Sequence, residues 1–193
     1  MKTLPMTTAA PVRALLDRRP FAWRIGAVLL GSWLLAASSW VEAPMYPVPM
    51  TMQTYALLVI AGLAGMRLAG EIVMVWLMQA AIGLPVLAGG AGGVAHLLGP
   101  TGGYLIGFVM AATLVGWLAE RPHGRGWLAL AGAFLLGHVV ILAAGWAWLS
   151  DLLGSAEKAW AGGVAPFLLG SVLKTALAVL TVKLAEPRLR QAR

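Results

Sequence analysis

The chain has 193 residues, of which 60% are hydrophobic and only 11% are charged, and its formal net charge is +7. In a soluble domain about a quarter of the residues are charged, and they cover its surface, so this composition excludes a soluble globular protein. The high hydrophobicity excludes a disordered protein. The chain contains no cysteine, which excludes disulfides, thiol chemistry and cysteine-ligated metals. The class that fits is a membrane protein.

Residues 1–20 are polar, and we expect a cytoplasmic N-terminal segment there. The first long apolar run follows at residues 21–41, which is long enough to cross a bilayer core of about 30 Å. The apolar core of a signal peptide has about 7–15 residues, so the length of this run favours a retained helix. The small residues Ala36-Ala37-Ser38 leave open the alternative that a signal peptidase cleaves there.

A proline-rich segment at residues 42–51 predicts a rigid loop, because proline fixes φ and lacks a backbone donor. Its prolines are Pro44, Pro47 and Pro49. The apolar stretch that follows, residues 52–88, is too long for one span and long enough for two short ones. We expect the break at Arg67–Glu71, where the charges require water, and Gly65 and Gly70 suit a tight hairpin there.

The next segment, residues 88–103, holds seven glycines in 16 residues and predicts a loop with a packing or ligand-binding role. Three more spans are expected, at residues 103–118, 126–148 and 164–184. They are joined by a polar turn at 120–125 and a loop at 150–163, and a basic cytoplasmic tail occupies 187–193. The sequence therefore predicts an all-α protein, a polytopic bundle of six transmembrane helices over residues 21–186.

Lysine and arginine are distributed unevenly among the expected loops. If the N-terminus is inside, twelve of them fall on the inner side and Lys158 alone on the outer side. The twelve are Lys2, Arg13, Arg18, Arg19, Arg24, Arg67, Arg121, Arg125, Lys183, Arg188, Arg190 and Arg193. Because positive residues mark cytoplasmic loops, both termini are expected inside. The basic residues then act as orientation signals, and no nucleic-acid partner is expected.

Lys174 lies near the middle of the sixth expected span, where a lysine costs about 2.5–3.5 kcal/mol to insert. Such a residue is a candidate for binding an anionic ligand, and the alternative is a structural partner inside the bundle. None of the expected spans carries an aspartate or glutamate at its middle, so Gln79 and His138 are the other polar groups at this depth. We interpret both of these as more typical of interior hydrogen bonding between helices, and ligand binding is the alternative for His138.

Small residues recur at spacings of four along the first expected helix, and such rows let helices approach closely. They are Ala27, Gly31, Ser32 and Ala36. Two interpretations stay open: the row packs the bundle itself, or it contacts a partner membrane protein.

The sequence lacks the motifs of several enzyme classes. The glycine-rich segment has no Gly-Lys-Ser/Thr and so is no phosphate-binding loop for ATP, and no Glu-x-x-His motif or serine triad order is present. Three scattered histidines without a nearby carboxylate pair make a poor metal site. We therefore expect no enzyme activity, no metal and no cofactor.

Four motifs, in order along the chain, resemble those of the BioY family, the biotin-specific S components of energy-coupling factor (ECF) transporters. They are Pro47-Val-Pro-Met-Thr-Met-Gln-Thr54, Gly83-Leu-Pro-Val86 with the glycines that follow to Gly93, Leu98-Gly-Pro-Thr-Gly-Gly-Tyr104, and Pro166-Phe-Leu-Leu-Gly-Ser-Val-Leu-Lys174. The resemblance implies the six-helix S-component fold in the inner (cell) membrane, surrounded by lipid. It also implies biotin as ligand and, as partners, a transmembrane T component and a pair of cytoplasmic ABC-type ATPases.

With this resemblance, we expect biotin to bind where the two outer loops fold over the bundle. The expected ligand-binding residues are Tyr46, Thr51, Gln53, Gly90, Gly93, His96, Tyr104, Ser171 and Lys174. The resemblance also favours the first-helix row of small residues as the contact with the T component. One position departs from the family pattern: Ser171 stands where an aspartate is expected. A self-sufficient biotin carrier, and a membrane-embedded sensor or enzyme, are the alternatives.

Overall fold

A computed structural model describes residues 10–17 and 19–191, and the basic residues Lys2, Arg18 and Arg193 that entered the orientation count lie outside them. The described chain is mostly helical. Its elements are α1 (Pro11–Leu16), α2 (Phe21–Ser39), β1 (Glu42–Ala43), β2 (Met50–Thr51), α3 (Gln53–Ala81), a short 3-10 turn η1 (Ala88–Gly90), α4 (Val94–Leu97), α5 (Gly102–Ala119), α6 (Trp127–Leu153), α7 (Ala156–Gly163) and α8 (Phe167–Gln191). Five of these helices, α2, α3, α5, α6 and α8, are long and apolar enough to cross a membrane.

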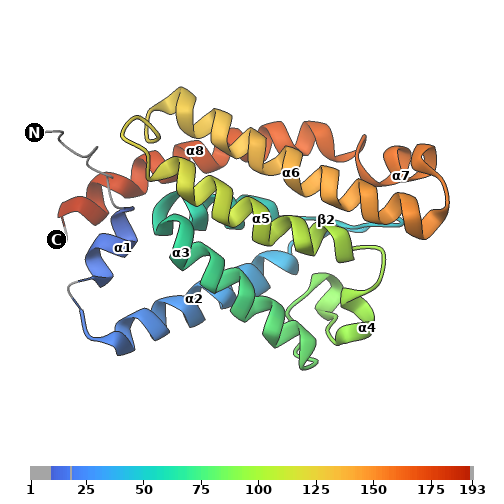
Figure 1. Ribbon diagram of the computed structural model, residues 1–193, viewed down its shortest axis with the longest axis horizontal. Coiled ribbons are helices and arrows are strands. Elements are labelled where there is room, and N and C mark those ends of the chain that lie inside the picture. The colour runs from blue at the N-terminus through green and yellow to red at the C-terminus, as the bar shows by residue number, and fades with distance from the viewer. Residues whose placement is uncertain (1–9, 18, 192–193) are drawn as a thin grey trace, which may run out of the picture.

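The long helices lie roughly along one axis, and α1 and the last turns of α8 lie at the same end of the molecule (Figure 1). Helix α5 packs between α3 and α6, α8 packs on α3 and α6, and α2 packs on α3 at the edge of the bundle. The centre is closed by large buried side chains such as Trp76, Phe134 and Leu58. Gly116 lets α5 approach α3 closely, because a Cβ at this position would lie 2.5 Å from the backbone nitrogen of Met66.

Helix α3 is interrupted at Gly65, whose φ of 78° and ψ of 176° are not helical. The teal ribbon of α3 changes direction sharply within its length (Figure 1). The apolar stretch is therefore divided at Gly65, one of the two glycines expected to suit the turn. Arg67 and Glu71, where the break itself was expected, lie inside the second half of the helix. Glycine adopts a positive φ at little cost, which explains the break at Gly65. The charge of Glu71 does not require a break, because Arg24 of α2 pairs with it and donates from Nε at 3.2 Å.

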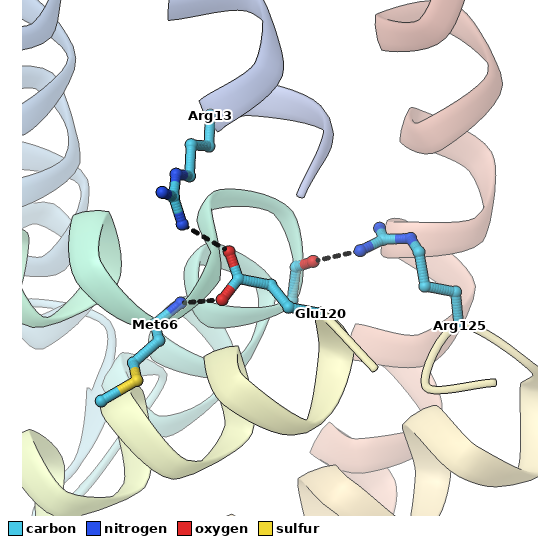
Figure 2. Close-up of polar contacts among 5 residues, drawn as sticks. Arg13, Met66, Glu120 and Arg125 are labelled. Carbon is cyan, nitrogen blue, oxygen red and sulfur yellow. Dashed lines mark hydrogen bonds and ion pairs between the residues drawn. The ribbon is translucent and has the colours of Figure 1, made fainter. Parts of the chain in front are cut away.

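Side chains from other elements satisfy backbone groups beside this break. The carboxylate of Glu120, at the end of α5, accepts the backbone N–H of Met66 at 3.4 Å and a hydrogen bond from Arg13 Nη1 at 3.1 Å (Figure 2). Arg125 Nη1 donates to the carbonyl of Gly62 at 3.0 Å. A helix end needs such partners for its unpaired groups, so these contacts fix the break of α3 to α1, α5 and the loop before α6.

The segment after α6 also differs from the expected loop at residues 150–163. Helix α6 continues to Leu153, and α7 follows with Ser155 as its N-cap, whose Oγ accepts the N–H of Lys158 at 3.3 Å. Helix α8 runs to Gln191, past its expected end at residue 184 and into the expected tail. Its last turns are held to the bundle by Glu186, which accepts from Arg125 Nε at 2.7 Å.

Candidate ligand-binding cavity

A cavity with about 670 Å³ of empty space, part of it open to the outside, lies among the β1–β2 segment, the first turns of α3, α5 and α8, and the middle of α6. It is lined by Val48, Pro49, Thr51, Gln53, Thr54, Leu87, Ala88, His96, Thr101, Tyr104, Leu105, Phe108, His138, Ile141, Leu142, Phe167, Ser171 and Lys174.

The apolar part of the cavity wall is built from aromatic side chains that are fixed by their neighbours. The ring of Phe108 stacks on buried Trp76, with 5.8 Å between centroids, and the rings of Tyr104 and Phe167 lie 6.3 Å apart. Tyr104 is held further by a hydrogen bond from its hydroxyl to the carbonyl of Gly163 at 2.7 Å. This wall is therefore preorganised for an apolar body, and Tyr104 presents its ring rather than a free hydroxyl.

The predicted rigid loop at residues 42–51 forms a short antiparallel ladder, with Glu42 opposite Thr51. The Glu42 carboxylate accepts the N–H of Gly89 at 3.1 Å, which joins this segment to the glycine-rich segment. Two short elements, η1 and α4, make up part of the glycine-rich segment. The structure thus brings the two segments together beside the cavity, as the sequence predicts.

Lys174 reaches the cavity from the third turn of α8, and its Nζ donates to the carbonyl of Thr51 at 2.7 Å. Thr51 Oγ1 in turn donates to Gln53 Oε1 at 3.0 Å. Among the described residues that line the cavity, Lys174 is the one lysine or arginine, and none is an aspartate or glutamate. The lysine therefore has a neutral carbonyl as its hydrogen-bond partner, and an anion in the cavity would be the first opposite charge beside it.

Three polar atoms on cavity-lining residues have no hydrogen-bond partner among the described residues. They are Gln53 Nε2, Thr54 Oγ1 and His138 Nε2. A buried polar atom without a partner costs about 1–3 kcal/mol. Three such atoms around one cavity indicate that a polar ligand completes them.

His138 combines the two roles that the sequence left as alternatives. Its Nδ1 lies 3.2 Å from the carbonyl of Phe134 and 3.2 Å from Thr175 Oγ1, as an interior residue does, while the residue also lines the cavity. Sequence reasoning missed His138 and Thr54 as site residues. The available signal for His138 was its position at the middle of an expected span, at the same depth as Lys174.

The expected ligand-binding residues divide into two groups. Lys174, Ser171, Gln53, Thr51, His96 and Tyr104 line the cavity together. Tyr46 is 92% exposed, and neither it nor Gly90 or Gly93 is part of the lining. A role for these last three stays a prediction.

The small residues of α2 pack inside the chain. Gly31, Ser32 and Ala36 are buried, and a Cβ on Gly31 would lie 2.7 Å from Ile72 Cδ1. Ser32 accepts from Gln79 Nε2 at 3.2 Å, which confirms the predicted interhelical role of Gln79. These three residues therefore pack inside the chain, and their role as a partner contact stays a prediction; Ala27 is half-buried.

Comparison with known proteins finds a family and relatives that all carry the name BioY. The model of the BioY family matches residues 7–191. A probable biotin transporter BioY of Pyrococcus horikoshii is 34% identical over 159 residues, covering 82% of this chain and 93% of the relative. The biotin transporter BioY of Thermotoga maritima is 34% identical over 147 residues, with 76% and 86% covered. That of Rhizobium etli is 37% identical over 142 residues, with 69% and 75% covered.

The fold is also found in a solved protein. The crystal structure of an S component for biotin from an ECF-type ABC transporter superposes with a TM-score of 0.77 at 26% sequence identity, covering 90% of this chain and 95% of that one. The family match spans nearly the whole chain, and the fold agrees with it. The chain belongs to the BioY family.

Proposed function

We propose that this protein is the biotin-capturing S component of an ECF-type vitamin transporter. The observation that carries the proposal is the cavity, in which one lysine and several unpaired polar atoms face an aromatic wall, in a member of the BioY family. As a substrate-capture subunit the protein is not an enzyme, and ATP hydrolysis belongs to partner subunits. Saturable binding of biotin, but not of nicotinate or thiamine, to the purified protein tests the proposal.

The chemistry of biotin matches the cavity group by group. Its apolar ring and tail suit the wall of Phe108 and Phe167, and its ureido group offers both donors and acceptors to Gln53 and His138. Its carboxylate suits Lys174, whose ammonium has three donors and uses one of them on Thr51. Ser171, where the family pattern has an acidic residue, leaves the lysine without an adjacent carboxylate and so favours an anionic ligand group.

The membrane arrangement that we propose has six crossings, with both termini in the cytoplasm and the cavity toward the outside. The break at Gly65 divides α3 into two short spans, so the five long apolar helices give six passes. Several of the described arginines lie at the end that holds α1 and the last turns of α8, where Arg13, Arg19, Arg24 and Arg67 line one cleft and Arg125 pairs with Glu186. Reporter fusions at residue 100 and after residue 193 should therefore report opposite sides of the cell membrane, and a shared side would overturn this arrangement.

The proposed partners are a transmembrane T component and ABC-type ATPases. Helix α2 supplies a surface for the T component, because only 22% of the residues in its apolar stretch are buried, against 61% of those in α5. A self-sufficient biotin carrier is the competing function. Biotin uptake into proteoliposomes that hold the chain alone, compared with vesicles that also hold the partners and ATP, separates the two.

A further inference from the structure

A second cleft, which shares no lining residue with the ligand cavity, lies where α1, the start of α2 and the break of α3 meet. It has about 870 Å³ of empty space, part of it open to the outside. The cleft is lined by four arginines, one aspartate and three apolar residues. The arginines are Arg13, Arg19, Arg24 and Arg67, the aspartate is Asp17, and the apolar residues are Leu16, Phe21 and Leu68. This basic cleft takes no part in the proposed biotin site.

Two of the four arginines are already paired with carboxylates. Arg13 pairs with Glu120, and Arg24 pairs with Glu71. Arg67 and Arg19 are exposed and have no acidic partner among the described residues, and the guanidinium of Arg19 lies 5.5 Å from the ring centre of Trp23. Even with Asp17 and both paired carboxylates counted, the cleft keeps one positive charge, so it favours an anion.

An apolar groove continues from the basic cleft along the bundle. It shares Phe21 and Arg24 with the cleft and runs between α2 and the second half of α3, with about 710 Å³ of empty space that is largely open. Its walls are Ile25, Val28, Leu29 and Val75, with Glu71 paired to Arg24 near its start. The groove therefore extends from the charged end of α2 toward the middle of that span.

We propose that the basic cleft and this groove together bind one anionic phospholipid of the membrane. Arg19 and Arg67 hold its phosphate, and one acyl chain lies along Val28 and Val75. The placement agrees with a lipid, because Phe21 begins α2 and so puts the arginines at the level where headgroups lie. A free phosphate would use the cleft alone, and a neutral lipid would use the groove alone.

This inference rests on the proposed function only in taking α2 and α3 as membrane spans. A lipid at this position fills the gap beside a helix that is otherwise poorly packed, and it holds α2 to α3 at the same end as the contacts of Glu120. Basic pockets between helices near a membrane surface are suited to acidic headgroups, with about 1 kcal/mol for each lysine or arginine.

The test uses the full chain, purified in neutral detergent and freed of lipid. Native mass spectrometry with added phosphatidylglycerol, with phosphatidylcholine of the same chains, and with glycerol phosphate gives the binding of each probe. We expect one phosphatidylglycerol to bind, with at least a tenfold preference over the other two. The double variant Arg19→Gln/Arg67→Gln should weaken that binding roughly thirtyfold.

Arg188→Gln is the matched control, because it removes one charge from an exposed arginine of α8 outside the cleft. It should bind phosphatidylglycerol as the wild type does, and biotin binding should be equal in all three proteins, which keeps this test separate from that of the proposed function. Equal binding of both lipids, or loss of binding in Arg188→Gln as large as in the double variant, would overturn the proposal. Glycerol phosphate that binds as well as phosphatidylglycerol would overturn it too, because the groove would then contribute nothing.

Discussion

Lys174 Nζ donates a hydrogen bond to the main-chain carbonyl of Thr51 at 2.7 Å, and this contact joins the third turn of α8 to the end of the β1–β2 segment. The two residues are far apart in the sequence, yet both line the same cavity. A carbonyl stabilises an ammonium by hydrogen bonding but does not neutralise its charge. The contact therefore positions the lysine at the cavity while leaving it able to bind an anionic group of the ligand.

The unpaired hydroxyl of Thr54 gives a prediction with two opposite effects. Thr54→Val keeps the shape of the side chain and removes an Oγ1 that has no hydrogen-bond partner in the described part of the chain. The ligand-free protein should keep or gain up to about 1 kcal/mol of stability, while biotin should bind roughly five- to tenfold more weakly. Thermal unfolding without ligand and titration with biotin measure the two effects.

Thr113→Val is the control for this experiment, because the hydroxyl of Thr113 bonds the Val109 carbonyl at 2.9 Å and lies outside the cavity. It should leave biotin affinity unchanged. Lower stability of Thr54→Val with unchanged affinity would show that the Thr54 hydroxyl serves the fold rather than the ligand.

The break of α3 predicts a strong difference between two glycines. Gly65→Ala should destabilise the protein by about 1–3 kcal/mol, because alanine disfavours the positive φ and its Cβ would press on the Glu120 carboxylate. Gly132→Ala, at an exposed helical position with nothing within 4 Å of the added Cβ, should have no effect or stabilise slightly. Thermal midpoints in one detergent compare the two, and an equal response would contradict the assigned role of Gly65.

Helix α2 gives a prediction that separates internal packing from partner contact. Gly31→Leu should lower the thermal midpoint of the isolated chain, because its side chain would collide with Ile72. Leu30 is 64% exposed and lies on the outer face of α2. Leu30→Ser should leave the stability and biotin binding of the isolated chain unchanged, and it should weaken recovery of the T component in a pull-down. If Leu30→Ser retains the partner fully, this face of α2 is not the contact.

Much of the architecture is readable from the sequence because a bilayer imposes long apolar runs. The runs of α2, α5, α6 and α8 are visible in that way. The break of α3 was expected at Arg67–Glu71, with Gly65 and Gly70 as residues suited to a turn. It lies at Gly65, because this residue accepts a positive φ, and the charges lie in the helix that follows. Helix α7 was missed because it is too short to show an apolar pattern in the sequence. Its formation depends on the Ser155 N-cap and on its packing against α6.

The candidate site was predicted in part for a similar reason. Lys174 is conspicuous because a lysine at mid-span is costly, and the family motifs point to Gln53, Thr51 and Ser171. Thr54 and His138 could not be assigned from the sequence, because the rotation of each helix about its axis decides which polar residues face the cavity. The same rotation turns Gly31 and Ser32 toward α3 rather than toward a partner.

The central claim is that Lys174 binds the carboxylate of biotin, and a cycle of two ligands and two proteins tests it most directly. The dissociation constants of biotin and biotin methyl ester are measured for the wild type and Lys174→Ala, with Lys158→Ala as a lysine control outside the cavity. A charge-assisted hydrogen bond contributes about 1.5–3 kcal/mol, so Lys174→Ala should bind biotin roughly ten- to a hundredfold more weakly. The ester should lose a similar factor in the wild type and in Lys158→Ala, and little more in Lys174→Ala; an unchanged biotin constant in Lys174→Ala, or an equal loss on esterification in every protein, would contradict the account.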